Sequence, residues 1–399
     1  MYTLRGKRIP MISRLGIIGL LSSFAVAAVA TIWAVYLDSF IKNAAYVGFI
    51  TAFFTVVGIC SYILLIPLVE KHNKLKLYYI AILIYIISYI SFALFPHIYV
   101  IIFLGAVIAI TASLKVTLFG IIIRDKTKDN CISKNEGIIY TLLNISWMIS
   151  PIIAGFISNK YGMRSVFFFS AMIFILTFIF LRFSKIQDNR RTKKIDTNPL
   201  KPLLNFFKKK ERIHAYILGG GINFWWVLIY IYIPLYIFES GFNEQIIGYF
   251  LGAVIIPLIF TEYYFAKLAG RKGFKKIFLI GYLILGISAL AVFFISNLYL
   301  ILLILALASF GAGMLEPTTE AYFFDIINKN QRDKFYGPYN TTIDLNTFLG
   351  TLSSAIILLF LPFKFIFILF SVVMFTFALV SSRIKNVIES RRNTTPHKL

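Results

Sequence analysis

Three charged residues interrupt stretches of sequence that are otherwise apolar. Lys115 follows the charge-free run 77–114, and Glu316 and Glu320 follow the charge-free run 277–315. A charge inside a membrane-spanning helix costs roughly 2.5–3.5 kcal/mol on insertion scales, so such residues are functional candidates. Glu316 and Glu320 are four residues apart, which places both carboxylates on one helical face. These side chains predict a site that binds a charged solute or carries protons.

Other residues within apolar runs add weaker candidates. Glu262 and Asp344 are each either a proton site or a partner of a gate. Trp225 and Trp226 are adjacent and cannot both face one way, so one of them is a candidate to stack on a ring or cation of the substrate. The run 215–238 also contains Asn223 and Tyr230. Trp33 and Tyr36 are typical of the aromatic belt at a membrane surface. Asp38 and Glu239 end their runs, where an outer gate or a plain surface position would both fit.

The elements that hold these residues are predicted to be transmembrane helices. Charged residues make up 14% of the chain and apolar residues 59%, against roughly a quarter charged in a soluble domain. A helix needs about 20 mostly apolar residues to cross the hydrocarbon. Ten charge-free runs predict twelve such helices, because the two longest break at Pro96-His97 and at Ser296-Asn297.

The positions of the basic residues predict the topology. The formal net charge is +23. If the twelve predicted helices cross a membrane alternately, 35 of the 40 Lys and Arg residues lie in loops on the same side. Such a bias places that side in the cytoplasm, so we expect a multi-pass protein of the cell membrane with both termini cytoplasmic. The basic excess then marks topology and an attraction to anionic membrane lipid, with no nucleic-acid partner needed.

The chain divides into two related halves. Residues 182–212 are polar and strongly basic, and they predict a cytoplasmic linker between an N-terminal six-helix bundle (1–181) and a C-terminal bundle with a short tail (213–399). An offset of 200 aligns Asp125 with Asp325 and Lys71 with Arg271. With six helices per half, the repeats must run parallel. We therefore expect an all-α integral membrane protein of two six-helix bundles related by a parallel pseudo-two-fold axis.

The loop after the second helix resembles a signature of the major facilitator superfamily (MFS), and the resemblance extends over nearly the whole chain. Glu70, Lys71 and Lys74 occupy its acidic and basic positions, although Ile66 and Asn73 replace its glycines. In the second half Arg271, Gly273 and Lys275 match better, with Gly270 in the place of the acid. The resemblance implies an inner gate in which these groups meet Asp125 and Asp325; the alternative is a solvated basic loop that only enforces topology.

The fifth helix resembles the antiporter signature of the same superfamily. Its small residues and proline match the positions of that signature: Ser146, Ser150, Pro151, Ala154 and Gly155. Small residues let helices approach closely, so the motif is either an antiporter feature or an ordinary packing seam. Within the family it is commoner among exporters that exchange solute for protons. The arginine that drug antiporters place about 20 residues before the acid of helix four is replaced by Gly105.

The resemblance also implies a central cavity lined by helices one, four, seven and ten. The offset of 200 places Lys115 opposite Leu315, so Lys115 and Glu316 are expected at similar depth, where opposite charges would offset each other or a charged substrate. The predicted cavity and coupling residues are Lys115, Glu316, Glu320, Asn223, Trp225, Trp226, Tyr230, Glu262 and Asp344.

The sequence predicts a transporter rather than an enzyme. It contains no phosphate-binding loop, catalytic triad or metal cluster, so no cofactor or metal is expected. We predict a monomeric secondary transporter of a small molecule that works by alternating access, with protons as coupling ion and a preference for export. The alternatives are a transporter-like substrate sensor and a facilitative uniporter of a small polar solute.

Overall fold

The computed structural model describes residues 11–126, 132–184, 186, 200–327 and 331–384, and all regular secondary structure in these ranges is helical. The first half consists of α1 (Met11–Ile41), α2 (Ala44–Leu64), α3 (Ile66–Lys71), α4 (Lys74–Leu94), α5 (Ile98–Lys126), α6 (Ile132–Tyr161) and α7 (Met163–Phe183). The second half consists of α8 (Leu200–Phe206), α9 (Lys210–Val227), the π-helix η2 (Leu228–Tyr232), α10 (Ile233–Glu239), α11 (Glu244–Lys272), α12 (Phe274–Phe293), α13 (Leu298–Ile326), α14 (Arg332–Phe360) and α15 (Phe365–Arg383).

Twelve helices within these ranges are long and apolar enough to cross a membrane, with α9, η2 and α10 forming one continuous span. This confirms the predicted number. The two predicted breaks are also confirmed, because α4 ends at Leu94 before α5 begins at Ile98, and α12 ends at Phe293 before α13 begins at Leu298. On either side of the predicted linker, α7 ends at Phe183 and α9 begins at Lys210.

Short polar and glycine connections end the helices. The side-chain oxygens of Asn73, Asn243 and Asn297 accept hydrogen bonds from backbone N–H groups in the first turns of α4, α11 and α13, which satisfies donors that a helix start leaves free. Gly162 joins α6 to α7 and Gly273 joins α11 to α12 as single residues with φ of 84° and 93°, a conformation that favours glycine. These turns keep successive helices antiparallel.

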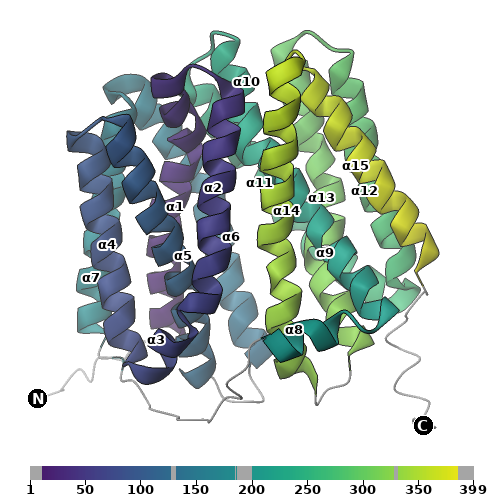
Figure 1. Ribbon diagram of the computed structural model, residues 1–399, viewed down its shortest axis with the longest axis horizontal. Coiled ribbons are helices and arrows are strands. Elements are labelled where there is room, and N and C mark those ends of the chain that lie inside the picture. The colour runs from purple at the N-terminus through teal and green to yellow at the C-terminus, as the bar shows by residue number, and fades with distance from the viewer. Residues whose placement is uncertain (1–10, 127–131, 185, 187–199, 328–330, 385–399) are drawn as a thin grey trace, which may run out of the picture.

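The helix contacts repeat from one half to the other. In the first half α4 packs on α7, α2 on α5, α1 on α6 and α1 on α7; in the second half α12 packs on α15, α11 on α13, α14 on α9 and α15 on α9. Each pair corresponds to its counterpart six spans later. The seams between the halves are α2 with α14 and α6 with α11, which the same pseudo-two-fold exchanges. Figure 1 shows the two bundles side by side, with α2 and α14 adjacent between them.

The two ends of the molecule differ. We call the end that holds α3 and α8 the basic end, and the end that holds α10 the α10 end (Figure 1). Near the α10 end the halves approach to backbone contact: a Cβ added at Gly155 of α6 would lie 2.6 Å from the carbonyl oxygen of Glu244, and one at Gly248 of α11 would lie 3.1 Å from the Cα of Gly155. On the other seam, a Cβ at Gly48 of α2 would lie 2.8 Å from the Cβ of Ala355 on α14.

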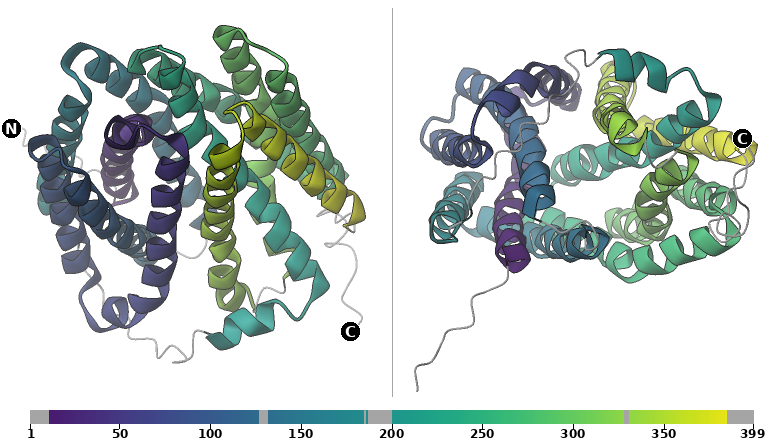
Figure 2. Two further views of the ribbon diagram at one scale, coloured as in Figure 1. Left: turned by 45° about the horizontal axis from the view of Figure 1, so that its top comes forward. Right: turned by 90° about the horizontal axis from the view of Figure 1, so that it is seen from below.

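The same helix faces separate toward the basic end. Fourteen residues are nearly four helical turns, so positions spaced by 14 share a face. On α2, Gly48 is buried, whereas Tyr62 is 38% exposed. On α6, Gly155 is buried and Thr141 is exposed; on α11, Gly248 is buried and Glu262 is partly exposed. The halves therefore pack tightly at the α10 end and diverge toward the basic end, as the view turned by 45° also shows (Figure 2).

Candidate functional site

Three acidic side chains of the second half lie at one depth. Glu262 lies ten residues before the end of α11, Glu316 ten before the end of α13, and Asp344 twelve after the start of α14. All three of these helix ends lie at the basic end, so at 1.5 Å per residue the acids are about 15–18 Å in from it. Glu316 is exposed and the other two are partly exposed. Glu316 lies within electrostatic range of Glu262, and nearby on the same two helices a Cβ added at Gly313 of α13 would meet the Thr261 hydroxyl of α11, so the two acids lie on neighbouring stretches of α13 and α11.

An aromatic group joins the halves beside Glu316. Tyr230 of η2 lies within electrostatic range of Glu316. Its ring makes an edge contact with Trp147 of α6, with ring centroids 5.2 Å apart, and a tilted contact with Trp226 of α9 at 5.6 Å. All three rings are partly exposed. The group therefore combines side chains of both bundles around one carboxylate.

Lys115 lies in a different environment. Its side chain is buried, with 9% of its surface exposed. The ammonium lies 5.4 Å from the ring centroid of Tyr85 on α4 and 5.8 Å from that of Phe174 on α7. These rings belong to the core of the first bundle. The structure shows no ion pair between Lys115 and Glu316, both of which it describes, so the expected pairing is absent from this conformation.

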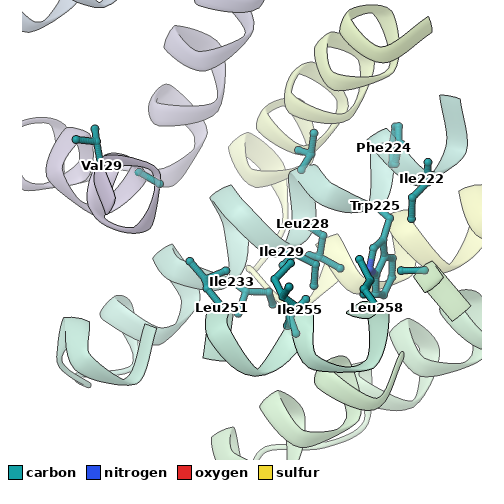
Figure 3. Packing of buried hydrophobic residues seen from close by; sticks show 14 of the residues in the cluster. Val29, Ile222, Phe224, Trp225, Leu228, Ile229, Ile233, Leu251, Ile255 and Leu258 are labelled. Atoms are coloured by element: carbon teal, nitrogen blue, oxygen red, sulfur yellow. The ribbon is translucent and has the colours of Figure 1, made fainter. Parts of the chain in front are cut away.

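The remaining cavity candidates make contacts within the second bundle. The carboxylate of Glu320 accepts a hydrogen bond from the Tyr336 hydroxyl at 2.6 Å. The amide of Asn223 donates to the carbonyl oxygen of Gly219 one turn earlier. Trp225 is fully buried, and Figure 3 shows it within the cluster of apolar side chains that includes Leu258. Of the two adjacent tryptophans, Trp226 is thus the one beside Tyr230.

The helix-five motif packs on two neighbours. The hydroxyls of Ser146 and Ser150 donate to the carbonyl oxygens of Leu20 and Phe24 on α1, at 2.9 and 2.6 Å. On another side, the Pro151 carbonyl and Gly155 face Gly248 of α11. Ala154 is fully buried. The small residues therefore let α6 approach both its own bundle and the opposite one.

The predicted inner-gate residues lie at the basic end. Lys71 and Arg271 are exposed, whereas Lys74, Lys275 and Asp325 are partly exposed and each has an interaction partner. The side chains of Glu70 and Asp125 lie outside the described part of the structure. Within the described residues, no three His, Cys, Asp or Glu side chains gather closely enough to hold a metal ion.

Comparison with known proteins identifies the family. The profile of the Major Facilitator Superfamily matches residues 15–272 and 241–397, which together cover nearly the whole chain. The chain belongs to the major facilitator superfamily. A curated relative within this superfamily, an uncharacterized MFS-type transporter of Methanocaldococcus jannaschii, is 22% identical over 54% of this chain and 57% of its own length. The chain therefore matches little more than half of that relative.

Solved structures of membrane transporters share the fold of this chain. A POT family transporter in complex with 5-aminolevulinic acid matches with a TM-score of 0.79 at 14% identity, over 92% of this chain and 94% of its own. A nucleoside transporter matches with a TM-score of 0.73 at 14% identity, over 93% and 98%. At such identity the likeness establishes the MFS fold alone.

Sequence reasoning missed part of the site. Trp147 lies inside the helix-five motif, yet only the small residues and the proline of that motif match the family signature. Its indole is the contact of that helix with Tyr230. A tryptophan among small residues at mid-helix, away from either membrane surface, was a signal that could have found it. The π-helix η2, which carries Tyr230, ends two residues before Pro234, a residue that cannot donate the ordinary helical hydrogen bond to the Tyr230 carbonyl and so is a sequence signal for an irregular turn.

Proposed function

We propose that this MFS member is a secondary active transporter of the cell membrane that exports a small solute in exchange for protons by alternating access. The observation that carries the proposal is the pair Glu262 and Glu316. These acids lie together at mid-depth where the halves diverge, and among the described residues neither forms an ion pair with a basic side chain. A carboxylate at such a depth is costly unless something neutralises it. A proton and a cationic group on the solute are the two candidates.

Exchange of solute for protons follows when a proton and the solute compete for one carboxylate. If a proton and the solute cannot occupy the same carboxylate together, then loading one releases the other. A transporter that changes conformation only when the carboxylate is neutralised would move one species out for each of the other moved in. The helix-five motif, which resembles that of antiporters, supports the direction of export.

The observed conformation suits loading from one side. With the basic end placed in the cytoplasm by the positive-inside rule, the halves are closed outside and diverge inward. Export would then begin with the solute entering from the cytoplasm. Rocking about the seams α2–α14 and α6–α11 would close the basic end and open the α10 end, as expected of two parallel repeats.

Proton flux in proteoliposomes tests the proposal. The protein would be reconstituted with the pH dye pyranine inside, and small organic cations, organic anions, zwitterions and sugars would be added outside in turn. We expect one class to raise the internal pH as it enters, because entry drives protons out. Glu262→Gln or Glu316→Gln should remove this response while counterflow of the radiolabelled solute persists at saturating solute concentration. Glu244→Gln, at the start of α11, is the matched control.

Two outcomes would overturn the proposal. Solute flux without any pH change in the wild-type protein would make it a uniporter. Saturable binding without flux would make it a sensor on a transporter scaffold. Both were alternatives at the level of the sequence, and the measurements of flux and pH separate them.

A further inference from the structure

We define the aromatic–acid site as Trp147, Trp226, Tyr230 and Glu316. Its ring faces and its carboxylate carry negative charge. Trp147 and Trp226 flank Tyr230 with ring centroids 5.2 and 5.6 Å away, and Tyr230 lies within electrostatic range of Glu316. Ring faces carry partial negative charge, and the carboxylate carries a full one. An anionic solute would be repelled by the carboxylate and by the ring faces of this site.

The nearby charged groups Glu262 and Lys115 do not neutralise the negative charge of this site. Glu262, on the neighbouring α11, adds a second acid within electrostatic range of Glu316. The Lys115 ammonium is directed toward Tyr85 and Phe174 inside the first bundle and forms no ion pair with Glu316. The site is also accessible, because its three rings are partly exposed and Glu316 is exposed.

The donor set distinguishes among cations. A bare metal ion such as Mg²⁺ or Ca²⁺ requires about six or more oxygen ligands, whereas this site offers one or two carboxylates and three rings. An organic cation needs only one counter-charge and gains from ring faces, at about 0.5–1 kcal/mol per exposed cation–π contact and about 2 kcal/mol per desolvated one. Its apolar body would in addition be buried against the rings.

We propose that the aromatic–acid site binds a monovalent organic cation with a flat, apolar body, such as a quaternary or protonated aromatic amine. This inference rests on the proposed function, since it names the solute class of the same transporter. A proton and the cation compete for Glu316, so the site itself would exchange one for the other. Because Trp147 belongs to the first half and the other three residues to the second, the cation would also contact both bundles.

Binding of ethidium to the purified full-length protein in detergent tests the proposal. We expect saturable binding, followed by fluorescence anisotropy, that weakens as the pH falls because protons occupy Glu316. Glu316→Gln should weaken binding by at least ~tenfold, and Trp147→Leu or Tyr230→Leu by ~3- to 30-fold each. Tyr230→Phe keeps the ring face and should bind like the wild type.

Matched controls lie outside the site. Trp33→Leu removes a ring that contacts Phe54 and Phe92 within the first bundle, and Glu244→Gln removes an acid at the α10 end; both should leave binding unchanged. Size-exclusion profiles and unfolding temperatures identify variants that fail to fold. If Glu316→Gln fails to fold, then Trp147→Leu and the pH titration of the wild type decide between binding at this site and binding elsewhere.

The outcomes separate this inference from the proposed function. Wild-type affinity in Glu316→Gln, or equally tight binding of the anionic dye fluorescein that Trp147→Leu also weakens, would overturn the substrate class. Proton-linked flux of a solute of another class, with no ethidium binding, would overturn it too and leave the proposed function standing. Ethidium binding that follows the predicted pattern, with no flux in proteoliposomes, would support the site and overturn the transport function.

Discussion

At the scale of single residues, the buried ammonium of Lys115 shows how one charge can be accommodated without a counter-ion among the described residues. Its contacts are the faces of Tyr85 and Phe174, which attract a cation through the ring quadrupole. Such contacts recover only part of the hydration that the ammonium loses on burial. Lys115 is therefore expected to lower the stability of the first bundle, independently of Glu316.

Removing this charge should stabilise the protein. We expect Lys115→Met, which keeps a long apolar stem, to raise the free energy of unfolding by about 1–3 kcal/mol. The effect should add to that of Glu316→Gln within ~0.5 kcal/mol, as for residues without a shared contact. A double-mutant cycle of unfolding in detergent measures this. A coupling clearly above that limit would show that the two charges do meet in a populated conformation.

Two acids of α13 should differ in function although they lie one turn apart. Glu320 is held by the Tyr336 hydroxyl at 2.6 Å, whereas Glu316 lies beside Tyr230 and Glu262. We expect Glu316→Gln to abolish the pH dependence of transport. Glu320→Gln should keep it and lose about 1 kcal/mol of stability, since the bond to a charged acceptor becomes a neutral one. Tyr336→Phe should reproduce that loss. Loss of pH dependence in Glu320→Gln would move the coupling role to that residue.

At the scale of elements, apolar run lengths predicted the helices well and their contacts poorly. The breaks near Pro96 and Asn297 were visible because polar and helix-ending residues interrupt an apolar run. The sequence did not show which helix of the other half packs on the helix-five motif, although Gly248 and Gly252 of α11 have the spacing that lets helices approach. Trp225 and Trp226 could not be distinguished either, because the apolar run around them does not show which side of the helix faces the core of the second bundle.

The crossing of α6 and α11 should control closure of the α10 end. A Cβ at Gly248 would meet the Pro151 carbonyl and the Gly155 Cα, so Gly248→Val should push the helices apart and disfavour the closed state. The pair Asn159 and Gln245, whose side chains form a 3.1 Å hydrogen bond across this seam, reports on it. In a background without native cysteines, Asn159→Cys with Gln245→Cys should cross-link readily.

Adding Gly248→Val should slow that cross-linking by at least ~tenfold, which corresponds to about 1.4 kcal/mol against the closed state. Gly120→Val of α5 is the control, because a Cβ at Gly120 meets nothing within 4 Å. Unchanged cross-linking in Gly248→Val would mean that the crossing relaxes around the added side chain. The glycines of α11 would then be a matter of packing only.

At the scale of the whole molecule, the two seams are related by the pseudo-two-fold that relates the bundles. Exchange of the halves converts α2–α14 into α11–α6, so a rigid rocking motion changes both seams together. The offset of 200 in the sequence predicted this symmetry, because duplicated bundles repeat their contacts. It did not predict which end is closed, since closure depends on contacts between halves that have diverged in sequence.

The orientation of the molecule in the membrane decides whether the closed α10 end faces the exterior or the cytoplasm. The loops that the sequence assigns to one side of the membrane contain 35 of the 40 Lys and Arg residues. The described helix ends of that side lie at the basic end, and positive-inside bias should keep this end in the cytoplasm. In single-cysteine variants expressed in cells, Ser240→Cys at the α10 end should react with a membrane-impermeant maleimide added outside. Lys209→Cys at the basic end should react only after the membrane is permeabilised. A fluorescent protein that matures only in the cytoplasm should be bright when fused after Leu399. The reverse labelling would place the basic end outside, and the aromatic–acid site would then load from the exterior, which would turn the proposed exporter into an importer.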